Sequence, residues 1–95
     1  MNPPLVIGGS RVVAYAVLKN VRPTGATVHA KPDGVIAAPY GIAVCGCPDE
    51  GGWFLFRCDK EWNVLADTWH SSEAEAKSQA EFEYEGVTAV WRQRS

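Results

Sequence analysis

The chain has 95 residues, of which 46% are hydrophobic and 21% charged, and its formal net charge is −2 at pH 7. This composition is typical of one globular domain with a modest core, and it excludes a disordered chain. The charge is uneven: of the 11 acids only Asp33 precedes residue 49, whereas four of the nine basic residues do. An acidic second half disfavours a broad phosphate-binding surface, so nucleic-acid binding is not expected.

The start of the chain, MNPPLVIGGS, is expected to form a loose arm over residues 1–10, because it has two prolines, two glycines and no periodicity. Its apolar run, Leu5–Ile7, is much shorter than a signal sequence or a membrane span requires. Three cysteines, an odd number, disfavour a fully paired disulfide framework. We therefore expect a single domain over residues 1–95 in the cytoplasm, with reduced thiols and no membrane contact.

Several stretches have the pattern of short β-strands. Residues 11–19 (RVVAYAVLK) are apolar at both alternating sets of positions, which is typical of a strand covered on both faces. The segments ATVHA and GVIAA flank KPDG, a strong turn signal, and together predict a hairpin. The other candidates are 40–47 (YGIAVCGC), 53–58 (WFLFRC) and 63–69 (NVLADTW), of which the last two form a second hairpin.

One helix is predicted over residues 72–85, where good helix formers predominate. Ser72 and Glu75 have the spacing of a capping box at its start, and Gly86 suits a left-handed residue after its end. Three residues spaced four apart form the expected packing stripe: Ala76, Ala80 and Tyr84.

Residues 87–91 (VTAVW) are the last predicted strand. The order of elements predicts an α+β fold: a mainly antiparallel sheet of about five short strands, covered by one C-terminal helix (72–85) and followed by a last strand. A short sheet with apolar strands leaves edges that need cover, and a homodimer would supply it.

Cysteine and histidine are the first candidates for chemistry. Cys45, Cys47, Cys58 and His70 are the residue types of a tetrahedral zinc site. The spacing Cys-x-Cys differs from that of a zinc knuckle, and free cysteine is among the most buried residue types. No metal or other cofactor is therefore expected, and this set is kept as a weak alternative.

A thiol enzyme is a second candidate, because Cys58, Asp67 and His70 supply a nucleophile, an acid and a base. If DKEW is a four-residue turn, Cys58 faces Asn63 and Phe54 faces Asp67. Asp67 and His70 then lie about four residue pairs, or about 13 Å, from Cys58. This register disfavours a direct contact between the thiol and the imidazole.

Asp67 and Trp62 are the polar and aromatic residues that the predicted elements explain least. The same register places Asp67 beside aromatic side chains, where a carboxylate must find hydrogen-bond donors or stay solvated. A structural role, in which Asp67 accepts hydrogen bonds from the segment entering the helix, is weighed against a binding role. Trp62 in a turn is either a lid over the core or a binding anchor, since tryptophan is enriched at binding hot spots.

The helix carries three acids near its C-terminal end, Glu81, Glu83 and Glu85, where they run against the helix dipole. Three interpretations are open: Arg57, Arg92 or Arg94 neutralises these acids within the fold, the acids only aid solubility, or they form a ridge that docks onto a basic protein surface.

The segment from Trp53 to Gly86 carries an aromatic strand, then CD…W, then DTWH, then an acidic helix ending in EYEG. In these features it resembles small bacterial proteins of unknown function that are carried in mobile integron cassettes, some of which resemble immunity proteins that block a toxin. The resemblance covers about a third of the chain, and no active-site residues follow from it.

The leading hypothesis is a non-enzymatic protein-interaction module, immunity-like in form, that binds a basic protein through acidic and aromatic surface around the second hairpin and the helix. The alternative is a small-molecule-binding domain with an apolar pocket between sheet and helix, and a thiol-dependent or other small enzyme comes third. The pocket would be lined by Trp53, Trp69, Tyr84 and Trp91. The candidate binding residues are Asp67, Trp62, Trp69, Trp53, Tyr84, Glu81, Glu83 and Glu85.

Overall fold

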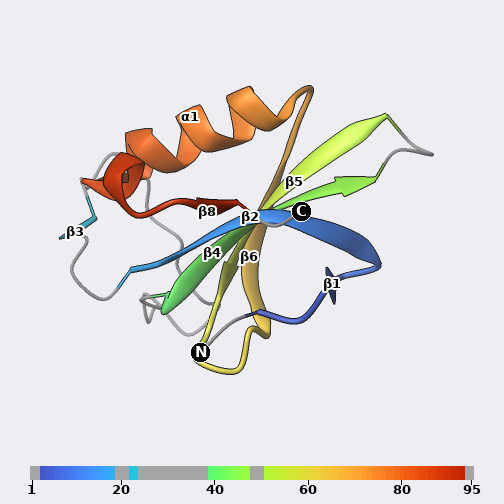
Figure 1. Cartoon of the computed structure of the whole chain (residues 1–95), viewed down its shortest axis with the longest axis horizontal. Coiled ribbons are helices and arrows are strands. Elements are labelled where there is room, and N and C mark those ends of the chain that lie inside the picture. Colours follow the sequence, from blue (N-terminus) through green and yellow to red (C-terminus); the bar gives the residue numbers. More distant parts are fainter. Residues whose placement is uncertain (1–2, 19–21, 24–38, 48–50, 94–95) are drawn as a thin grey trace.

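The structure, a computed structural model of the chain, describes residues 3–18, 22–23, 39–47 and 51–93. The hairpin expected around KPDG lies outside these residues. An antiparallel sheet has the strand order β1-β2-β4-β5-β6, and the helix α1 lies along one side of it (Figure 1). The predicted α+β fold is thereby confirmed. The elements of the sheet and its cover are β1 (Val6–Ile7), β2 (Ser10–Val17), β4 (Gly41–Cys47), β5 (Gly52–Cys58), β6 (Val64–His70) and α1 (Glu73–Glu83).

The stretch expected as a loose arm contains the first hairpin instead. Ile7 of β1 pairs with Ser10 of β2, and both residues are buried. Gly8 and Gly9 form the two-residue turn between them with φ values of 57° and 81°. Two positive φ values are what a type I′ hairpin turn requires, and glycine adopts them without steric cost. The pair of glycines was the sequence signal for this hairpin.

The strand β2 is covered on both faces, as predicted, but the alternation of its side chains between the two faces is interrupted. The register with β4 shifts between Val12 and Ala14, which marks a bulge. Ala14 and Ala16 pack toward α1, whereas Val12 and Tyr15 pack on the opposite face of the sheet.

Two apolar clusters therefore sandwich the sheet. The buried residues between sheet and helix are Ala14, Ala16, Leu18, Ile42, Val44, Leu55, Ala76, Ala80, Tyr84 and Val87. Those on the other face are Ile7, Val12, Tyr15, Ala43, Cys45, Phe56, Cys58 and Trp62. The predicted packing stripe of the helix is thus confirmed, and no helix of the described residues contributes to the second cluster.

The helix begins as predicted, because the Ser72 hydroxyl accepts a hydrogen bond from the backbone N–H of Glu75 at 3.0 Å. It ends two residues earlier than expected. Tyr84 and Glu85 leave the helix as a two-residue strand, β7 (Tyr84–Glu85), which pairs with β3 (Arg22–Pro23). Within the described residues, no helix is both long and apolar enough to cross a membrane.

The last strand follows at a different place from the one predicted. Gly86 has a left-handed φ of 86°, and residues 87–89 form a 3-10 turn, η2 (Val87–Ala89), rather than a strand. The strand β8 (Arg92–Gln93) then pairs with β2. Gln93 also links to the helix, since its amide donates to Glu73 and accepts from Lys77, both at 3.0 Å.

Candidate functional site

The pairing of β5 with β6 decides which side chains share a face of the sheet. Phe56 lies opposite Asp67, and Phe54 lies opposite Trp69. The expected register, with Phe54 opposite Asp67, is therefore wrong by two residues. One residue arises because Cys58 pairs with Val64 rather than with Asn63, and the other from the ladder irregularity between Arg57 and Cys58. A shift of two residues preserves the faces. Asp67 and Trp69 thus share the face of Phe54 and Phe56, which is the face away from α1.

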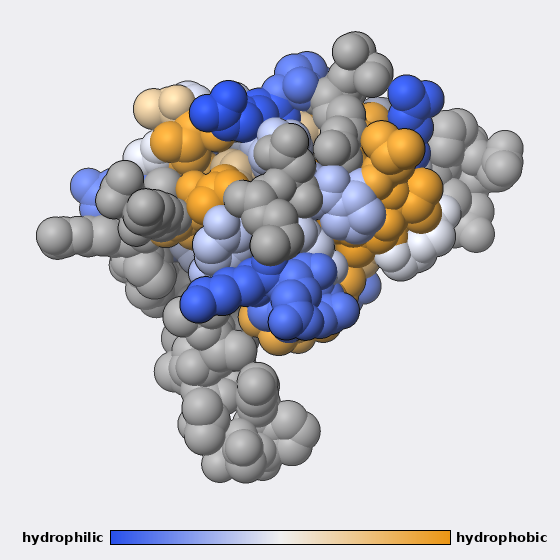
Figure 2. All heavy atoms as spheres, turned by 60° about the horizontal axis from the view of Figure 1, so that its bottom comes forward, coloured by the Kyte–Doolittle hydropathy of each residue, from blue (hydrophilic) through white to orange (hydrophobic). Residues whose placement is uncertain are grey.

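One edge of the sheet carries four exposed side chains that we call the β6 edge surface: Val64, Leu65, Asp67 and Trp69. Trp69 is 58% exposed, and its indole lies so close over Gly52 that a Cβ there would overlap the ring nitrogen. The ring is thereby seated on the sheet. The Asp67 carboxylate has no hydrogen-bond or ion-pair partner among the described residues. Seen from the side away from α1, the surface shows separate hydrophobic patches beside strongly hydrophilic residues (Figure 2).

Trp62 is a lid over the core and not an exposed anchor. Its side chain is 4% exposed, and it meets Tyr15 and Tyr40 edge-to-face with ring centroids 6.0 and 6.1 Å apart. A Cβ on Gly41 would lie 2.5 Å from the indole, so glycine is needed beneath it. The backbone of Trp62 is left-handed with φ 64°, which bulky residues rarely adopt.

Asp59 builds the turn that places Trp62. Its carboxylate accepts the backbone N–H groups of Glu61 and Asn63, both at 2.9 Å, and its carbonyl accepts the N–H of Trp62 at 3.0 Å. The hydrogen bond from the Asn63 backbone holds the pKa of Asp59 below its ordinary value. These bonds offset the strain of the left-handed tryptophan and turn its ring back over the sheet.

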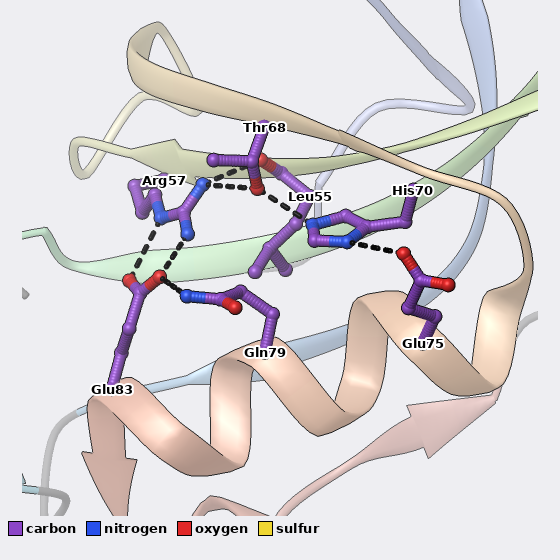
Figure 3. A network of polar contacts seen from close by, with 7 residues as sticks. All are labelled: Leu55, Arg57, Thr68, His70, Glu75, Gln79 and Glu83. Carbon is purple, nitrogen blue, oxygen red and sulfur yellow. Dashed lines mark hydrogen bonds and ion pairs between the residues drawn. The ribbon is translucent and has the colours of Figure 1, made fainter.

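A buried ion pair joins the sheet to the helix (Figure 3). The Arg57 guanidinium on β5 binds the Glu83 carboxylate through two hydrogen bonds, one of them 3.0 Å from Nε to Oε1. The same guanidinium donates to the carbonyl of Leu55 at 2.9 Å and to the hydroxyl of Thr68 at 3.0 Å. Gln79 donates to Glu83 at 2.7 Å. Both charged side chains are 2% exposed, so each depends on the other for compensation of its charge.

The network continues to His70 at the end of β6. One ring nitrogen lies 2.7 Å from the Thr68 hydroxyl, and the other lies 3.5 Å from a Glu75 oxygen (Figure 3). A hydrogen bond from the Ser71 hydroxyl is the main cause that holds the pKa of the exposed Glu75 below its ordinary value. His70 is itself buried, so it orders the entry to the helix rather than facing solvent.

The acidic ridge expected on the helix is smaller than predicted. Glu83 is 3% exposed, and its carboxylate is paired with Arg57. Neutralisation by an arginine of the fold was one alternative to the ridge, and for Glu83 it is what the structure contains. Glu81 and Glu85 are exposed, as is the aromatic side chain of Phe82.

The cysteines do not form the arrangements considered above. Cys45 and Cys58 are free and buried on the face away from α1, whereas His70 lies on the helix side, so the sheet separates them. Burial raises the pKa of each of the two thiols to about 12, which leaves almost no thiolate at neutral pH. The side chain of Cys47 lies outside the described part of the chain. Neither a thiol nucleophile at Cys58 nor the weak zinc alternative fits this geometry.

The residues expected to line a pocket between sheet and helix are divided between the two faces of the sheet. Trp53, Tyr84 and Trp91 lie on the helix side, whereas Asp67 and Trp69 lie on the other face. The buried residues of the first cluster pack together beneath α1. Burial of the ring is the main cause that raises the pKa of Tyr84.

Sequence reasoning missed the polar network as a unit. It named Arg57 only as one of several partners for the helix acids, and it did not connect Thr68 and Gln79 to them. The signal was the arginine itself, since a charged residue inside the apolar strand WFLFRC has to find a partner. Comparison of the chain with protein-family models, with curated proteins and with solved structures gave no match.

Proposed function

We propose that the protein is a non-enzymatic interaction module that binds a protein with a basic surface. The β6 edge surface carries this proposal, because it combines a solvated carboxylate with exposed apolar side chains on a strand that, within the described sheet, is paired on one side. An immunity-like role in the cytoplasm, where the partner is a toxin, is one form of this function. The buried free thiols suit a reducing compartment.

Three groups of the described residues that an enzyme could use for catalysis are engaged in structural contacts instead. The Cys58 thiol is buried and protonated, His70 is held between Thr68 and Glu75, and the Arg57 guanidinium is saturated by its pair and its hydrogen bonds. General acid–base or nucleophilic catalysis requires such groups within reach of a substrate. Their engagement supports a binding role over a catalytic one.

The end of α1 and the strand β7 carry two further exposed acids. Glu81 and Glu85 project into solvent, and Phe82 beside them is 58% exposed. An aromatic side chain flanked by carboxylates suits a basic surface, because the ring supplies apolar area while the acids steer the approach.

Binding to a panel of purified basic proteins tests the proposal, with acidic proteins of similar size as negative probes. The double variant Glu81→Gln with Glu85→Gln is expected to weaken binding about fivefold at low salt, since each rim charge pair contributes roughly 0.2–1 kcal/mol. The matched control is Leu5→Lys with Val6→Lys, which adds the same charge at two exposed residues, one just before β1 and one within it, at the other edge of the described sheet. Equal binding of acidic proteins, or equal weakening by both pairs of substitutions, would overturn the proposal.

A further inference from the structure

We propose that the edge of β6 that pairs with no other strand of the described residues binds an extended segment of the partner as an added β-strand, with a lysine or arginine of that segment opposite Asp67. This inference rests on the proposed function and specifies its binding mode. It assigns the β6 edge surface a partner of defined chemistry, a basic strand flanked by apolar residues.

The geometry of the edge supports strand addition. In the described sheet β6 has β5 on one side and no strand on the other, so half of its backbone N–H and C=O groups point away from the sheet. The strand has seven residues, which is long enough to pair with a peptide. At the far edge, β1 has only two residues. The two edges of the sheet therefore differ in what they can bind.

The negative charge of Asp67 favours a segment with a basic residue as the strand that pairs with β6. Asp67 is the only charged residue in β6 apart from the titratable His70, and it lies exposed between apolar neighbours. A residue paired across two antiparallel strands interacts directly with the one opposite, where unlike charges attract and like charges repel. A second copy of this chain, paired about a two-fold axis at Asp67, would place two carboxylates against each other. A basic residue in that position is favoured instead.

The neighbours of Asp67 define the flanking residues of the segment. Trp69 lies two residues further along on the same face and offers a seated, largely exposed ring. Val64 and Leu65 are 42% and 38% exposed at the other end of the strand. Because side chains alternate across a strand, apolar residues two positions before and after the basic residue would contact these groups.

The test uses a capped peptide of seven residues, the length of β6, with lysine at its centre, valine two positions to either side and threonine elsewhere. This sequence reads the same in both directions, so parallel and antiparallel pairing present the same side chains. The full-length protein is expected to bind the lysine peptide about five- to tenfold more tightly than the same peptide with a central glutamate. Amide resonances of β6 should shift and gain protection from hydrogen exchange. Asp67→Lys, an exposed substitution that leaves the core intact, should reverse the preference.

N-methylation separates strand addition from attraction by charge alone. Methyl groups on alternate peptide nitrogens should abolish binding when they fall on the set that faces β6 and have little effect on the other set. Equal loss for both sets, no preference between lysine and glutamate, or self-association of the protein through β6 would each refute the inference. If basic proteins still bind in a manner that depends on Glu81 and Glu85, the proposed function stands while the strand-addition mode is rejected.

Discussion

Replacing Glu83 by glutamine is expected to destabilise the fold severely, although the substitution is nearly isosteric. The carboxylate is buried and receives two hydrogen bonds from Arg57 and one from Gln79. Without it, the guanidinium remains 2% exposed and has no counter-charge. Removing one partner of such a pair costs about 3–5 kcal/mol. A domain of this length has a free energy of unfolding of roughly 5–14 kcal/mol, so the substitution would remove about a fifth of it or more.

The measurement is urea-induced unfolding followed by tryptophan fluorescence. Glu81→Gln, two residues away on the exposed side of the same helix, is the matched control and should change the free energy of unfolding by less than about 0.5 kcal/mol. The double variant Arg57→Met with Glu83→Met should be more stable than Glu83→Met alone, because no unpaired charge stays buried. Equal midpoints for Glu83→Gln and Glu81→Gln would refute the reasoning.

Three further predictions concern the lid, the thiols and the acid response. Gly41→Ala should lower the free energy of unfolding by about 1–3 kcal/mol, because its Cβ would lie 2.5 Å from the Trp62 indole; an unchanged denaturation curve would contradict this. In a Cys47→Ser variant, the two remaining buried thiols should react with iodoacetamide about a thousandfold more slowly than in urea, since their pKa rises from 9.0 to about 12. A hydrogen bond from Gln93 is the main cause that lowers the pKa of Glu73, so its contribution is present above the ordinary value of 4.5 and is lost as pH falls through the folded pKa. Glu73→Gln should therefore lose less stability than the wild type between pH 7 and pH 3 in urea titrations.

Local sequence patterns were sufficient to predict those helices and strands that are determined by residues close together in the chain. Ser72 with Glu75 marks the helix start because the cap bond lies within one turn. The apolar strand at residues 53–58 and its partner at 63–69 were found from composition and spacing. The two-residue error in their register arose because neither the longer turn, which pairs Cys58 with Val64, nor the ladder irregularity beside Cys58 has a local signature.

Longer-range features could not be predicted with the same success. The helix ends at Glu83 because Tyr84 and Glu85 pair with Arg22–Pro23, about sixty residues earlier in the chain. The 3-10 turn at residues 87–89 replaces the predicted strand, although VTAVW has strong β-propensity, because the left-handed Gly86 redirects the chain. In both cases tertiary context overrides the local preference.

Trp62 and Asp67, which the predicted elements left unexplained, differ in burial: Trp62 is buried in the core, whereas Asp67 is exposed to solvent. Trp62 required a left-handed backbone, which Asp59 provides through hydrogen bonds within the turn, and the indole gains a core position over Gly41. Asp67 has no comparable compensation among the described residues, because no donor approaches it and it stays in water. A carboxylate on the exposed edge of an apolar strand disfavours indiscriminate edge-to-edge association. The same charge favours a basic strand over an acidic or neutral one, so protection of the edge and selection of a partner follow from one side chain.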